Sequence, residues 1–113
     1  MEEKIIDTKT VKIAAQVIIF AGNARVILND VVLAIEDKNF AKAEELIKKA
    51  EAEMTKAHEI QTDIIQAEAR GQSLELSLLL THAQDTLMSA NTEIRMICHM
   101  LRLFKKMYEE MRK

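Results

Sequence analysis

Apolar residues recur at alternating intervals of three and four over residues 74–111. This spacing forms a single stripe along a helix that packs in a bundle. The stripe comprises Leu76, Leu80, Ala83, Leu87, Ala90, Ile94, Ile97, Leu101, Phe104, Tyr108 and Met111. The pattern therefore predicts one long helix with a continuous buried side.

A second apolar row lies nearly opposite this stripe when the residues are placed at intervals of about 100°. It consists of Leu78, Met88, Met96, Met100, Leu103 and Met107, and Asp85 falls within it. A helix that is apolar on two sides either lies in the middle of its domain or packs against another chain. Because the chain is too short for many helices, we expect contact with identical copies.

Residues 11–35 are strongly apolar, so a membrane span is the first alternative to consider. Lys12, Arg25 and Asp30, together with three amides, interrupt this run. They leave no uncharged apolar stretch of about 18 residues, the length that a span requires. We therefore predict no membrane insertion, but a helix over roughly 8–35 that is buried on most of its sides, in a bundle and against neighbouring chains.

Residues 40–70 have the pattern of an ordinary amphipathic helix, with Glu and Lys on its outer side. Asp37 or Asn39 can cap its start, Gly71 suits a left-handed helix end, and Ser73 can cap the next helix. Its predicted inner side comprises Phe40, Ala43, Ile47, Ala50, Met54, Ala57, Gln61 and Ile64.

The predicted fold is a single all-α domain over 1–113, with helices at roughly 8–35, 40–70 and 74–111. Short connections between three helices give an antiparallel up-and-down three-helix bundle. A helix of about 38 residues is about 57 Å long, whereas a compact domain of this size has a radius of gyration of about 13 Å. The monomer must therefore be elongated, with apolar surface left for other copies to cover.

Composition narrows the possible partners and compartment. The chain has no proline, two glycines, and 16 basic against 18 acidic residues, which are interspersed and give a formal charge of −2. No basic stripe is present, so we expect no nucleic-acid partner. A single cysteine, Cys98, excludes an internal disulfide, and no leader-like segment opens the chain. These features predict a cytoplasmic protein.

Candidate chemistry is concentrated at His82 and Asp85, which lie three residues apart on the same side of the third helix. A neutral imidazole is a good nucleophile near pH 7. Asp85 lies among apolar residues, where a carboxylate is costly unless it is paired, protonated or bound to a metal. A hard divalent cation would resolve this cost. His58 and His99 lack comparable surroundings, and we interpret both as structural.

The segment at 78–88, LLLTHAQDTLM, resembles the signature of the IIA component of the lactose/cellobiose (N,N'-diacetylchitobiose) family of the bacterial sugar phosphotransferase system. AGNAR at 21–25 and AHEIQT at 57–62 resemble the family as well. The resemblance implies a three-helix bundle that forms a homotrimer. It implies that His82 accepts a phosphoryl group from the phosphocarrier protein HPr. His82 would pass this group to a Cys of the IIB component, which phosphorylates the sugar carried by the membrane component IIC.

The resemblance also implies roles for the residues around His82. Asp85 would meet its symmetry mates on the trimer axis, where Mg²⁺ is expected. Thr86 replaces the second His of the family motif. Its hydroxyl can donate a hydrogen bond to a phosphoryl oxygen but cannot carry positive charge. Independently of the resemblance, Gln84 and Thr86 lie near His82 in the sequence, and Gln61 or Arg25 could approach from the other helices. Any of them could steady phosphoryl oxygens, with Arg25 the strongest candidate because of its charge.

Two alternatives to a phosphoryl carrier remain at the level of sequence. The first is a non-catalytic helical adaptor or regulatory relative of the family that oligomerises without being phosphorylated, and Thr86 is its only indication. The second is a metalloprotein that uses His82 and Asp85 as ligands. This alternative is weaker because two ligands three residues apart do not complete a metal site.

Overall fold

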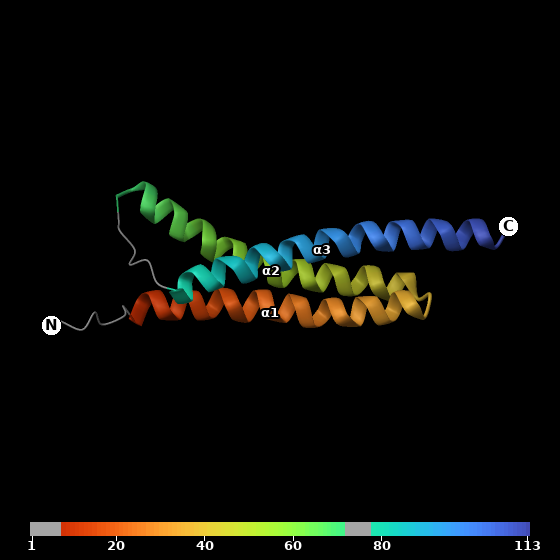
Figure 1. Cartoon of the computed structure of the whole chain (residues 1–113), viewed down its shortest axis with the longest axis horizontal. Helices are drawn as coiled ribbons and strands as arrows, with labels where there is room; N and C mark the ends of the chain where they lie inside the picture. The colour runs from red at the N-terminus through yellow and green to blue at the C-terminus, as the bar shows by residue number, and fades with distance from the viewer. Residues whose placement is uncertain (1–7, 72–77) are drawn as a thin grey trace.

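The computed structural model of the 113-residue chain describes residues 8–71 and 78–113, and these form three helices with no strand. The helices are α1 (Thr8–Glu36), α2 (Phe40–Ala69) and α3 (Leu78–Met111). α1 and α3 run in the same direction and α2 runs opposite to them (Figure 1). The predicted all-α up-and-down bundle is confirmed. The predicted start of the third helix at 74–77 lies outside the described residues.

The ends of the helices agree with the turn residues in the sequence. The Asn39 side-chain Oδ1 accepts a hydrogen bond from the backbone N–H of Lys42 at 3.2 Å. Asn39 rather than Asp37 therefore caps α2. Gly71 has the predicted left-handed backbone, with a φ of 85°. Lys38 also adopts a positive φ of 60°, in a region that L side chains rarely occupy. The predicted cap at Ser73 lies outside the described residues.

The core lies along the centre of the bundle and is formed by one stripe from each helix. Ala, Val and Leu supply most of α1's contribution, and the small residues allow the helices to approach closely. The predicted stripe of α2 is confirmed apart from half-buried Phe40 and Gln61, and that of α3 is confirmed from Leu80 to Leu101. The buried residues with less than 2% exposure and the largest side chains are Leu28, Leu87, Val17, Val31 and Thr10.

Within a single chain α1 is buried on one side, and the part of the prediction that involves burial against neighbouring copies stays a prediction. Ile19, Val26 and Leu33 are 56%, 65% and 56% exposed, because they lie opposite the stripe that faces the core. The stretch Lys9–Glu36 is long and apolar enough to cross a bilayer by length and composition alone. The core helix of a soluble protein meets the same criterion, and one side of α1 contributes to the core here.

The molecule is elongated, as predicted from the length of its helices. Its radius of gyration is 18.2 Å and its extents are 71 × 25 × 17 Å. The C-terminal end of α3 projects beyond the turn between α1 and α2 (Figure 1). Phe104 and Met111 are consequently 46% and 80% exposed, so the prediction that they continue the buried stripe is wrong. At the other end, the last turns of α2 diverge from α3 (Figure 1).

Candidate functional site

His82 lies on the second turn of α3 and is exposed to solvent. Its neighbours Leu80 and Ala83 are buried in the core, which directs residue 82 outward. No side chain of the described residues forms a hydrogen bond or ion pair with its imidazole. The ring is therefore accessible to a reactant from outside the chain.

His82 and Asp85 both belong to the outer side of α3. Eighteen residues make five helical turns, so His82 is aligned with Met100 and Asp85 with Leu103. Met100 and Leu103 are 46% and 55% exposed. We call the exposed apolar residues on this side of α3 the outer row, which comprises Leu78, Met88, Met96, Met100, Leu103 and Met107. The predicted second apolar row is thus confirmed, and the histidine lies beside it.

Thr86 is half-buried one turn beyond His82. Its hydroxyl donates a hydrogen bond to the backbone carbonyl of His82, with an Oγ1 to O distance of 2.9 Å. A threonine in the middle of a helix often satisfies its hydroxyl in this way. In this rotamer the hydroxyl hydrogen does not point toward a group bound to the imidazole. Sequence reasoning could not find this arrangement, because it depends on a side-chain rotamer.

The other predicted supporting residues do not meet His82 within one chain. Gln84 lies two positions further along α3, about 200° around the helix from His82. Arg25 forms an ion pair with Glu93, in which Nε and Oε2 are 2.9 Å apart. Glu93 is eleven residues from His82, or about 16 Å along the helix axis. Gln61 is half-buried on α2 and forms no side-chain hydrogen bond within residues 8–71 and 78–113.

Asp85 is exposed and has no hydrogen-bond or ion-pair partner in the part of the chain that the structure describes. The same part contains no group of three or more His, Cys, Asp or Glu residues that could hold a metal ion. One chain therefore offers a single carboxylate, a hard oxygen donor suited to Mg²⁺. This donor fits a cation only if other copies supply further oxygen ligands.

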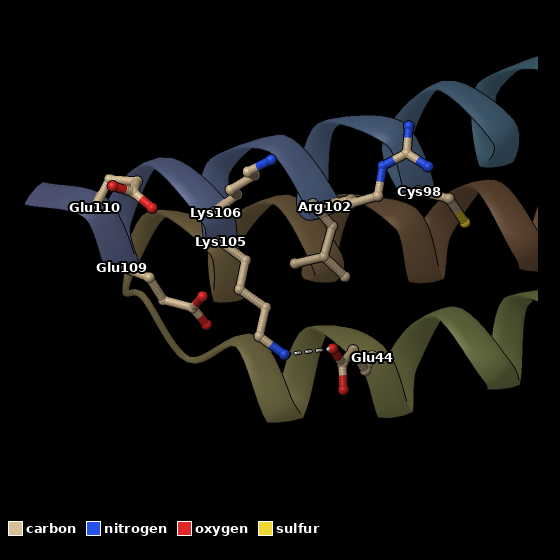
Figure 2. A pocket seen from close by; sticks show the side chains of 8 residues that line it. Glu44, Cys98, Arg102, Lys105, Lys106, Glu109 and Glu110 are labelled. Carbon is tan, nitrogen blue, oxygen red and sulfur yellow. Dashed lines mark hydrogen bonds and ion pairs between the residues drawn. The ribbon is translucent and has the colours of Figure 1, made fainter.

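A groove of about 630 Å³ between α2 and the second half of α3 is a further concave surface. It contains Cys98 and is bridged by an ion pair between Lys105 Nζ and Glu44 Oε1 at 3.2 Å (Figure 2). Burial, and secondarily the charge of Glu51, raises the pKa of the Cys98 thiol. Because a reactive cysteine needs a lowered pKa, Cys98 is not an activated nucleophile here.

Comparison with known proteins gives consistent matches over most of the chain. The family model described as "PTS system, Lactose/Cellobiose specific IIA subunit" matches residues 12–105. A lichenan-specific phosphotransferase enzyme IIA component from Bacillus subtilis is 35% identical over 99 residues, covering 88% of this chain and 90% of that protein. A lactose-specific EIIA component from Lacticaseibacillus casei is 36% identical and covers 80% of both chains.

A solved structure extends the match to three dimensions. The crystal structure of a PTS cellobiose-specific enzyme IIA from Bacillus anthracis superposes with a TM-score of 0.84 at 35% identity. The match covers 96% of this chain and 95% of that one. At this identity and coverage, the similarity includes both sequence and fold.

Proposed function

Because the chain belongs to the lactose/cellobiose-specific IIA family of the sugar phosphotransferase system, we propose that His82 is its phosphoryl acceptor. As a IIA component, the protein works with a IIB component. In the proposed relay, HPr donates the phosphoryl group to His82, and His82 passes it to a Cys of IIB. IIB then phosphorylates the sugar that the membrane component IIC carries.

The observation that carries this proposal is the exposed and unpartnered imidazole of His82 within the described residues. A ring nitrogen attacks phosphorus while the bond between phosphorus and the donor breaks. In the second step the phosphorus–nitrogen bond breaks as a bond to the IIB sulfur forms. Phosphoryl transfer of this kind depends on positioning and charge stabilisation more than on covalent activation. An accessible ring that two different proteins can approach in turn meets this requirement.

We further propose that the protein assembles as a homotrimer through the outer row. Met88, Met96 and Leu103 are 61%, 55% and 55% exposed. A row of exposed apolar side chains of this kind commonly marks a protein interface. Asp85 is a carboxylate on this side of the helix. Three copies around an axis would place three carboxylates together, and Mg²⁺ bound by them would relieve their repulsion.

We propose a cytoplasmic location, which the proposed partners and the charge pattern support. HPr and the IIB component are the proposed docking partners, and neither requires membrane insertion or nucleic-acid binding. The basic and acidic residues are interspersed along the chain, which suits a soluble carrier that meets several proteins in succession.

A second candidate function is a non-catalytic adaptor of the same family, which oligomerises but is not phosphorylated. Thr86 is the observation that favours it, because its hydroxyl is directed to the His82 carbonyl and the family's second imidazole is absent from this position. The adaptor and the phosphoryl carrier would have the same fold and the same outer row, so only a measurement of phosphoryl transfer distinguishes the two functions.

Reconstitution with phosphoenolpyruvate, enzyme I, HPr and a purified IIB component tests the relay. We expect IIB to gain a phosphoryl group on cysteine only when this chain is present, and His58→Gln to behave like the wild type. His82→Gln should abolish transfer. If IIB is phosphorylated equally with His82→Gln, the proposed acceptor is wrong.

A further inference from the structure

A second groove lies at the opposite end of the molecule from His82, where α3 projects beyond the turn between α1 and α2. Its volume is about 510 Å³, within the range of known binding sites. We call it the distal groove. Its floor is apolar and its edge carries charges; the lining residues are Ile35, Phe40, Phe104, Met107, Tyr108 and Met111, with Glu36, Lys38 and Arg112 at the edge.

Two cations of the distal groove flank a single aromatic ring. Lys38 Nζ lies 5.3 Å and Arg112 Cζ 5.6 Å from the centroid of the Tyr108 ring. The Phe40 ring packs against the Tyr108 ring, with 5.7 Å between the two ring centroids. Within residues 8–71 and 78–113, neither cation has a carboxylate partner. The groove therefore presents two oriented cations whose charge is not paired.

The backbone at Lys38 is a second unusual feature of the distal groove. Lys38 occupies the left-handed region, with a φ of 60°. It does so just after α1, at a position where glycine is the usual residue. A side chain is disfavoured in this conformation because its Cβ comes too close to the following carbonyl oxygen. The same conformation directs the Lys38 ammonium over the Tyr108 ring. A glycine at this position would relieve the strain but would supply no charge.

The charged residues that line the distal groove carry a small excess of positive charge. Lys38 and Arg112 line it together with one carboxylate, that of Glu36. Arg102, Lys105 and Lys106 line the first groove instead and add nothing here. The two cations of the distal groove therefore favour an anionic partner. Part of the groove, including Tyr108 and Arg112, also lies outside the family match, which ends at residue 105. The distal groove therefore lies only partly within the span of the family match.

The openness of the groove determines the kind of partner. Phe104, Met107 and Met111 are 46%, 58% and 80% exposed, so a small molecule would remain largely in solvent. Small-molecule sites usually bury most of the ligand surface. A protein segment is large enough to shield the groove from solvent itself, as when an apolar side chain anchors a peptide in a groove. An aromatic anchor flanked by carboxylates would satisfy both the apolar floor and the unpaired cations.

We propose that the distal groove is a docking site for an acidic segment of a partner protein. One large apolar side chain of the segment packs between Phe104 and Met111, and its carboxylates pair with Lys38 and Arg112. The proposal is independent of the phosphoryl relay, since it uses no residue of the His82 site.

Fluorescence anisotropy with a labelled, capped peptide of sequence Asp-Glu-Asp-Trp-Leu-Glu-Asp-Glu tests the proposal on the full chain. We expect saturable binding that weakens with salt. Two control peptides should not bind, one with every acid replaced by Lys and one with Trp-Leu replaced by Ala-Ala. Reversing both cations, as Lys38→Glu with Arg112→Glu, should weaken binding at least about tenfold, which corresponds to about 1.4 kcal/mol.

Matched variants separate docking from misfolding. Lys48→Glu with Lys49→Glu makes the same charge change on the exposed side of α2. This control pair should leave binding within about twofold of the wild type. Lys38→Arg with Arg112→Lys retains both charges and should also bind. Absence of peptide binding, or equal binding of the basic peptide, overturns the proposal. It is also overturned if anionic phospholipid vesicles bind in place of the peptide, or if the charge reversal changes only self-association.

Discussion

At the scale of single residues, His82 and Thr86 are one helical turn apart, yet their polar groups are not directed at a common ligand. The Thr86 hydroxyl donates to the His82 carbonyl at 2.9 Å, and the imidazole is open to solvent. This arrangement distinguishes the role of Thr86 from that of His82, which the sequence alone could not do. Thr86 contributes a local backbone hydrogen bond, whereas the proposed phosphoryl chemistry involves the imidazole of His82.

The role of Thr86 is tested by Thr86→Val, which removes the hydroxyl and retains the shape of the side chain. Because this hydroxyl is already used within the helix, we expect the rate of phosphorylation by HPr to change by less than about threefold. Rapid-quench measurement of phosphoprotein formation provides the rate, and Thr92→Val on the same helix is the control. A loss of about tenfold or more only in Thr86→Val would show that the hydroxyl contacts the phosphoryl group.

The position of the candidate site could be predicted from the sequence, but its contacts could not. His82 and Asp85 follow from helical spacing and from the resembling segment, and both lie on the outer side of α3 as expected. Arg25 was a plausible partner for a phosphoryl group because of its charge. Its actual partner, Glu93, is 68 residues away in the chain, and such a pairing depends on how the helices pack.

At the scale of elements, helix ends and buried stripes were largely predictable because they depend on local spacing. Asn39, Gly71 and the stripe from Leu80 to Leu101 lie as expected. The exposure of Phe104 and Met111 was not predictable from the period of the stripe. It depends on where the turn between α1 and α2 lies beside α3, which is a property of the assembled bundle.

The cap at Asn39 provides a prediction at this scale. Asn39→Ala removes the acceptor of the Lys42 N–H. Loss of this cap should lower the free energy of unfolding by about 1 kcal/mol. Asn39→Asp retains a capping oxygen and should remain close to the wild type. Urea denaturation followed by circular dichroism measures both. Equal stability of the wild type and Asn39→Ala would contradict the assignment of this residue as the cap.

At the scale of the whole molecule, the exposed apolar surface is the main feature that one chain does not explain. The outer row runs along most of α3, and α1 contributes a further exposed stripe that includes Ile19, Val26 and Leu33. The bundle is too thin to cover these residues itself, since its shortest extent is 17 Å. Association of copies is the arrangement that would remove this surface from water.

Met96→Lys tests whether the outer row is buried between copies of the chain. The residue is 55% exposed in one chain. A lysine there should therefore change the stability of an isolated monomer by no more than about 0.5 kcal/mol. Buried between copies, the same lysine should dissociate the proposed trimer. Ile65→Lys on α2 starts from the same exposure of 55% and serves as the control. Sedimentation equilibrium should show monomers only for Met96→Lys, and a trimer that persists in this variant would contradict the interface.

Asp85→Leu tests the proposed cation site. Replacing the carboxylate removes repulsion between copies, so the oligomer should be at least as stable as the wild type and independent of divalent cations. The wild type should lose thermal stability after chelation and regain it with Mg²⁺. Asp63→Leu, an exposed position on α2, should retain the response to Mg²⁺. Dissociation of Asp85→Leu to monomers would count against the axial position of Asp85.

The most direct test of the account is intact mass spectrometry at alkaline pH after incubation with phosphoenolpyruvate, enzyme I and HPr. We predict that the wild type gains one acid-labile phosphoryl group per chain and that His82→Gln gains none, while His99→Gln behaves like the wild type. Failure of the wild type to gain the group, or modification of His82→Gln, would contradict the assignment of His82 as the phosphoryl carrier.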